Sequence, residues 1–138
     1  MGFDDIATDT VLEWNVTVTS ELIDNFAAAI SDFNPLHMSH EKAIQAGFET
    51  RLLHGVGLIG LISTAVATKL PGEGSILLKI DASFIKPAYL GSELVCSLKV
   101  AKKFKSNNTV RFSYLIRNDD LDKLALGSAS VMVPSSKY

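Results

Sequence analysis

The sequence predicts an α+β fold in which a curved antiparallel β-sheet wraps around one long central helix. Residues 52–68 contain no charged side chain if His54 is neutral, which is typical of a buried helix. Much of the remaining chain alternates apolar with polar residues, the pattern of strands that bury one face. Because such a sheet must bury its apolar face against another element, we expect it to cover this helix. The 138 residues fit a single domain, residues 1–138.

The first third of the chain is expected to form a strand and two helices. Residues 11–18 alternate, and their apolar face carries Leu12, Trp14 and Val16. A helix follows, for which Ser20 is a suitable N-cap. Because Pro35 disfavours the α conformation in the residue before it, this helix should end at about residue 32 or 33. A short second helix is expected from residue 40 to 46.

The central helix is expected to run from about Leu53 to Leu70, some 26 Å at 1.5 Å per residue. Pro71 and Gly72 then stop it. Its length alone does not exclude a membrane span. Polar side chains dilute the run and no basic cluster flanks it, so we expect a helix buried on nearly all sides and no membrane partner.

The remaining chain is expected to be four antiparallel strands, at residues 76–84, 93–100, 109–116 and 124–133. Turn residues at 106–108 and 118–120 predict hairpins between the last three. In the first of these strands the even positions are apolar and are expected to face the core: Ile76, Leu78, Ile80, Ala82 and Phe84.

Composition narrows the classes of function. The net charge of −2 and the pI of about 5.9 argue against nucleic-acid binding, which usually requires a basic excess. The single cysteine, Cys96, cannot form an intrachain disulfide, so an oxidising compartment is not indicated. The first residues are acidic and lack an apolar run, so no secretory signal is expected and a cytoplasmic location is predicted.

Asp32 and His37 form the first candidate pair for catalysis. They stand five residues apart with Pro35 between them, so a turn can fold the two side chains together. A carboxylate beside an imidazole is the usual pair for moving a proton on and off water. The alternative is that Asp32 closes an Asx turn and His37 is a half-buried loop histidine.

The start of the central helix is the second candidate site. The N–H groups after His54 lack helical partners and favour negative charge, and Gly55 allows close approach of a ligand, as an oxyanion on a thioester would require. Alternatively, Gly55, Gly57 and Gly60 only allow tight packing. Ser63, about two turns further, either faces the site or bonds back to the Ile59 carbonyl.

Three histidines, His37, His40 and His54, raise the question of a metal. Catalytic zinc takes three protein ligands, and no Glu-x-x-His pairing or third helical ligand accompanies them. We therefore expect no metal site.

Taken together, several of these elements resemble the MaoC-like (R)-specific enoyl-CoA hydratases and dehydratases, over nearly the whole chain. The resemblance rests on the segments 31–37 (Ser-Asp-Phe-Asn-Pro-Leu-His) and 70–75, and on Phe48, His54 and Gly55. It implies the hot-dog fold, in which a sheet wraps on a central helix. The sequence departs from the family at Thr50-Arg51-Leu52, where an aliphatic run with proline is frequent.

The resemblance implies a lyase of fatty acid metabolism that adds water reversibly and syn to a trans-2-enoyl-CoA, giving the (R)-3-hydroxyacyl-CoA. Asp32 and His37 would be the catalytic pair, assisted by Ser63, with the Gly55 N–H on the thioester carbonyl. Gly55 at the thioester would place Leu58, Ile59 and Ile62 along the acyl tail. No cofactor beyond the carrier on the substrate is implied, and a homodimer is expected.

Alternatives remain open at this point. A dehydratase acting on 3-hydroxyacyl groups on acyl carrier protein would use the same residues. A thioesterase of this fold would not explain Asp32 and His37 as a pair. A non-catalytic acyl-thioester-binding protein would not need the intact element.

Overall fold

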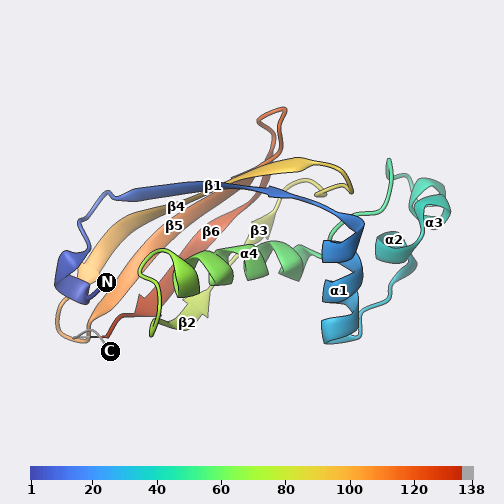
Figure 1. The fold of residues 1–138 in the computed structure, drawn as a ribbon. Helices are drawn as coiled ribbons and strands as arrows, with labels where there is room; N and C mark the ends of the chain where they lie inside the picture. Colours follow the sequence, from blue (N-terminus) through green and yellow to red (C-terminus); the bar gives the residue numbers. More distant parts are fainter. Residues whose placement is uncertain (135–138) are drawn as a thin grey trace.

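A computed structural model of the chain describes residues 1–134, which form one sheet around one helix (Figure 1). The six-stranded sheet has the order β1-β4-β5-β6-β2, and a two-residue strand, β3, also pairs with β6. All pairings are antiparallel. The strands are β1 (Val11–Thr17), β2 (Ile76–Ile80), β3 (Ser83–Phe84), β4 (Glu93–Phe104), β5 (Thr109–Arg117) and β6 (Lys123–Met132).

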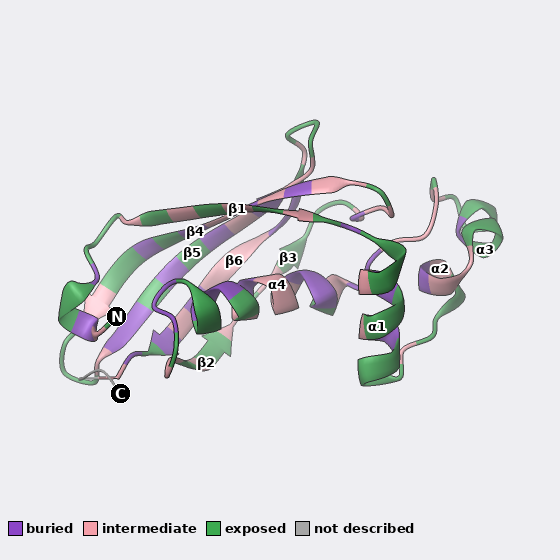
Figure 2. Cartoon of the chain, viewed as in Figure 1, coloured by how far each residue is buried: buried purple, intermediate pink, exposed green. Residues whose placement is uncertain are grey.

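The central helix is α4 (Gly55–Thr68), which lies along the concave side of the sheet, as predicted (Figure 1). Buried residues on one side of it face the sheet, among them Leu58, Ile62 and Val66. The expected burial on nearly all sides is not found within the chain, because Val56 and Thr64 on the other side are exposed (Figure 2). No helix in residues 1–134 combines the length and apolarity that crossing a membrane requires.

The other helices gather beyond one end of the sheet, and the N-terminal turn η1 (Phe3–Asp5) lies at the other end (Figure 1). They are α1 (Ser20–Ile30), α2 (Pro35–Met38) and α3 (His40–Gln45). The N-cap of α1 is Thr19 rather than Ser20, because the Thr19 hydroxyl accepts from the Leu22 amide at 3.0 Å. This helix ends slightly early, at Ile30, where Ser31 adopts a left-handed conformation with φ of 58°.

The predicted strand 76–84 differs most from expectation. It divides into β2 and β3, and a bulge between Leu77 and Lys79 shifts its pairing with β6. As a result Leu77 and Ile80 pack against the core, whereas Ile76, Leu78 and Phe84 are about half exposed. The simple alternation thus assigned the wrong face to part of this segment.

Candidate active site

Asp32 is held at the end of α1 through both of its backbone groups. The left-handed turn at Ser31 reverses the chain, and the Asp32 amide donates to the Ala27 carbonyl at 3.0 Å. The Asp32 carbonyl accepts a hydrogen bond from His54 Nε2 at 2.9 Å. One carboxylate oxygen, Oδ1, accepts from the Asn34 amide at 3.2 Å, which is the Asx turn considered as the alternative role. The turn occupies only Oδ1 within the described residues, so it leaves the carboxylate able to act on a ligand.

His37 lies on α2, a short helix that the sequence analysis did not predict. Asn34 caps it by accepting from the Leu36 amide at 3.1 Å, and Pro35 occupies its first position. The buried His37 ring places Nδ1 2.8 Å from the Leu52 carbonyl. A carbonyl can only accept, so Nδ1 carries the hydrogen and the neutral ring keeps a lone pair on Nε2.

His54, the residue before α4, is the third member of the cluster. Its ring is 1% exposed and stacks on His37, with ring centroids 3.7 Å apart and planes inclined by 24°. The same ring contacts Phe26 of α1, at a centroid distance of 5.2 Å. Because Nε2 donates to the Asp32 carbonyl, the neutral ring keeps its lone pair on Nδ1, which is buried and has no hydrogen-bond partner among residues 1–134.

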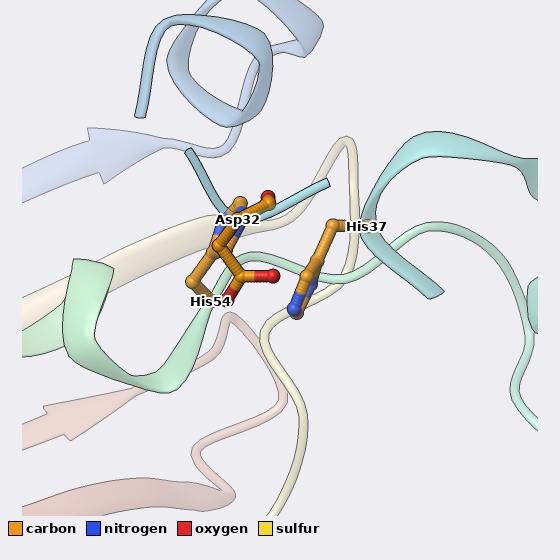
Figure 3. A group of neighbouring side chains, drawn as sticks. All are labelled: Asp32, His37 and His54. Atoms are coloured by element: carbon orange, nitrogen blue, oxygen red, sulfur yellow. The ribbon is translucent and has the colours of Figure 1, made fainter. Parts of the chain in front are cut away.

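The three side chains converge in space. One ligand-type atom each from Asp32, His37 and His54 lies within 4.8 Å of the other two. Figure 3 shows the Asp32 carboxylate pointing toward the His37 ring, with His54 next to both. The arrangement suits proton transfer between water and the pair. It suits a metal poorly, because nearly parallel stacked rings do not aim their in-plane lone pairs at one point.

His40, the remaining histidine of the sequence, lies outside this cluster. It is exposed, and its Nδ1 is 2.9 Å from the Thr50 hydroxyl.

Gly55 begins α4 and borders an apolar cavity of about 280 Å³. The cavity is adjacent to the cluster of Asp32, His37 and His54, since Leu53 and Gly55, on either side of His54 in the chain, line it. Its other lining residues include Phe48, Leu58, Phe84 and Pro87. The Phe84 ring covers Gly55 so closely that an added Cβ would lie 3.3 Å from its Cε1 and Cζ atoms. A cavity with amide donors at its wall can hold an apolar chain next to a polarised carbonyl.

The other predicted site residues are less well aligned with this cavity. Leu58 lines it, one turn from Gly55. Ile62 lies on nearly the same face of α4 as Gly55 but about 10 Å further along the helix, where it is completely buried in the core and does not line the cavity. Half-buried Ile59 does not line the cavity either. Ser63 is half-buried, and within residues 1–134 its hydroxyl bonds neither to Ile59 nor to Asp32. Leu58 therefore remains the best candidate of the three for an acyl contact.

A larger hollow of about 550 Å³ adjoins the cavity, sharing Lys86 and Pro87 with it. Its lining is mostly polar and includes Glu49, Asp120 and Asp122. Lys86 is 3.2 Å from the Asp122 carboxylate, and the Asn118 side chain followed by Lys86 lowers the pKa of Asp122. This hollow is not lined by Leu53 or Gly55, the chain neighbours of His54, whereas the smaller cavity is, so we regard the smaller cavity as the candidate site.

Three residues at the site were not identified from the sequence as contributing side chains: His54, Arg51 and Phe84. Arg51 donates from Nε to the His37 carbonyl at 2.6 Å and pairs with Asp24 of α1, so its guanidinium is bound within the chain. A signal was present for His54, since a histidine directly before an apolar helix is poorly placed to remain in solvent. Arg51 and Phe84 carry no comparable signal.

Comparison with known proteins supports this architecture. A family model described as "MaoC like domain" matches residues 4–118. An (R)-specific enoyl-CoA hydratase of Rhodospirillum rubrum is 30% identical over 141 residues, which cover 96% of this chain and 92% of that protein. A mitochondrial 3-hydroxyacyl-[acyl-carrier-protein] dehydratase of Arabidopsis thaliana is 26% identical over 143 residues, covering 97% and 85%.

Among solved structures, the unliganded R-hydratase PhaJ1 from Pseudomonas aeruginosa superposes with a TM-score of 0.93 and 31% identity, covering 99% of this chain and 88% of that one. The prediction of a curved sheet around a central helix is thus confirmed in a hot-dog domain. With a matching family model and a relative of 30% identity along nearly its whole length, the chain belongs to the MaoC-like domain family.

Proposed function

We propose that the protein is a hydro-lyase that adds water reversibly to a trans-2-enoyl-CoA, forming the (R)-3-hydroxyacyl-CoA. The observation that carries the proposal is the meeting of Asp32 and His37 beside an apolar cavity whose wall contains the N-terminus of α4. The (R)-specific hydratase of R. rubrum, 30% identical over 96% of this chain, supports the same conclusion.

In the hydration direction, water must lose a proton as its oxygen bonds to C3, and a proton must be added at C2. The lone pair on His37 Nε2 is suited to accept the proton, because the Leu52 carbonyl fixes the hydrogen on Nδ1. The Asp32 carboxylate orients the water, and the pair returns one proton to C2. One molecule of water is added in total, with no change of oxidation state across the two carbons, so no redox cofactor is required.

The negative charge that develops on the thioester oxygen is placed at the Gly55 amide. This N–H is at the first position of α4, where no helical carbonyl accepts it and the helix dipole favours an anion. The acyl chain enters the cavity beside Leu58 and Phe84. Ser63 is retained as a weaker assisting candidate.

Dehydration of a 3-hydroxyacyl group carried by acyl carrier protein is the second candidate. The plant mitochondrial relative bears that name, and the chemistry of the pair runs in both directions. Rates with the same enoyl group on CoA and on acyl carrier protein decide between the carriers.

We also propose a homodimer located in the cytoplasm. The edge strand β2 exposes Ile76 and Leu78 by about half, and Val56 on the uncovered side of α4 is 52% exposed. A second copy that pairs along this edge would shield both features. The buried, unpaired thiol of Cys96 is compatible with a reducing compartment.

The test is hydration of crotonyl-CoA, followed as loss of the enoyl absorbance, with chiral analysis of the product. Asp32→Asn and His37→Ala should each lower kcat at least about a hundredfold, the lower range for a positioned acid or base. His40→Gln is the matched control, because His40 is exposed and outside the cluster. An (S) product, or near wild-type rates in both cluster variants, would refute the proposal.

A further inference from the structure

We propose that His54 is a positioning residue that sets the mutual geometry of Asp32 and His37, through one hydrogen bond and one ring contact. The inference rests on the proposed function, because it takes Asp32 and His37 as the reacting pair. It assigns a role to a side chain that this mechanism otherwise does not use.

His54 contacts both members of the pair by different means. Its Nε2 donates to the Asp32 carbonyl at 2.9 Å, which fixes the backbone that carries the carboxylate. Its ring stacks on His37 at a centroid distance of 3.7 Å, which fixes the plane in which the His37 Nε2 lone pair points. The two catalytic residues come from different elements, the end of α1 and α2, and His54 bridges these elements.

The environment of His54 favours positioning over direct proton transfer. The ring is 1% exposed, packed between Phe26 and His37. Its Nδ1 is buried and has no hydrogen-bond partner in the part of the chain that the structure describes. A histidine that only filled the core could be replaced by an apolar ring, which would remove that unpaired nitrogen. The feature that an apolar ring cannot supply is the donor at Nε2.

Two substitutions separate the donor from the ring. His54→Gln keeps a donor, because the Gln amide nitrogen is four bonds from Cα, as is His Nε2, but it removes the stacked ring. His54→Phe keeps a ring and removes the donor. His54→Asn is the matched polar control, because its amide nitrogen is one bond shorter and corresponds to the Nδ1 position.

The experiment measures kcat and KM with crotonyl-CoA for the wild type and the three variants, together with far-UV circular dichroism. We expect His54→Phe and His54→Asn to lower kcat by about tenfold to a hundredfold, the effect of misplacing a reacting group by about 1 Å, while KM changes by less than about twofold. His54→Gln keeps the donor but loses the ring contact, so its kcat should fall less than that of either other variant, by about threefold to tenfold. If His54→Phe does not fold, the comparison of Gln with Asn decides the question.

Equal kcat values for Gln and Asn, or losses confined to KM, would overturn the inference. A second readout does not depend on activity: long-range ¹H–¹⁵N correlation spectra of the wild type should show His54 protonated at Nε2 and His37 at Nδ1. A His54 ring protonated at Nδ1 would overturn the inference even in an active enzyme. An inactive wild type overturns the proposed function and this inference with it, whereas an active wild type with unchanged variants overturns the inference alone.

Discussion

Replacing Gly55 with alanine tests whether the start of α4 binds the thioester. The added Cβ would lie 3.3 Å from Cε1 and Cζ of Phe84 and 3.5 Å from its Cδ1. These contacts are tighter than ordinary packing, so the ring must shift by a few tenths of an ångström. Because Phe84 is 51% exposed, the shift should cost little folding stability. The added methyl group would instead occupy the space between the Phe84 ring and the Gly55 amide. The thioester carbonyl of the substrate must enter this space to reach the amide.

The expected effect on activity follows from the donor that is obstructed. Complete removal of one oxyanion donor lowers kcat by about a hundredfold to a thousandfold, and partial obstruction should cost less. We therefore expect Gly55→Ala to lower kcat/KM for crotonyl-CoA by about tenfold to a hundredfold, while the urea unfolding midpoint changes little.

Gly60 is the matched control for this substitution. It lies in the same helix, and a Cβ there would meet only Phe26 Cε2, at the ordinary distance of 3.8 Å. Gly60→Ala should raise the free energy of unfolding by about 0.5–1 kcal/mol through helix propensity and leave kcat unchanged. If both variants keep wild-type kcat/KM, the Gly55 amide does not bind the carbonyl and the reasoning is wrong.

Three further predictions concern the support of the fold and its assembly. Arg51→Met should lower the free energy of unfolding by about 2 kcal/mol in urea titrations, because the His37 carbonyl loses its charged donor; a loss below about 0.5 kcal/mol contradicts this. Burial raises the pKa of Cys96 to about 12 from 9.0, so the unfolded chain loses this proton first and stability falls as pH rises above about 9. From pH 8 to 10 the free energy of unfolding of the wild type should therefore fall by about 1 kcal/mol more than that of Cys96→Ala. Equal decreases in the two proteins would contradict a raised pKa of the Cys96 thiol. Light scattering should give about twice the chain mass of 14.9 kDa, with Leu78→Lys shifted toward the single-chain mass, and a wild type at 14.9 kDa contradicts the dimer.

Much of the fold was predictable because its signals are local. Alternation identified β1, β4, β5 and β6, and the uncharged run identified α4. The strand at 76–84 could not be predicted in the same way, because a bulge inserts one residue and reverses which positions face the core. Alternation indicates that a strand has one buried face, but the pairing with the neighbouring strand determines which residues lie on that face.

The candidate site was predictable where residues are close in sequence. Asp32 and His37 meet as expected because Ser31 reverses the chain and Asn34 with Pro35 starts a new helix between them. The acyl contacts were predicted less well. Counting turns from Gly55 gave Ile62, which shares a face of the helix with Gly55, but the cavity reaches only as far as Leu58 and Ile62 lies beyond it in the core.

The geometry of the pair is fixed mainly by the segment before α4. Leu52 accepts from His37 Nδ1 with its carbonyl, Arg51 donates to the His37 carbonyl, and His54 donates to the Asp32 carbonyl. Leu52 contributes only its backbone carbonyl, so many side chains could replace it at this position. The bonds from Arg51 and His54 are made by their side chains and therefore depend on the residue type. Substitutions at residues 51 and 54 should therefore change kcat more than a substitution at exposed Phe33, although Phe33 is adjacent to Asp32 in the chain.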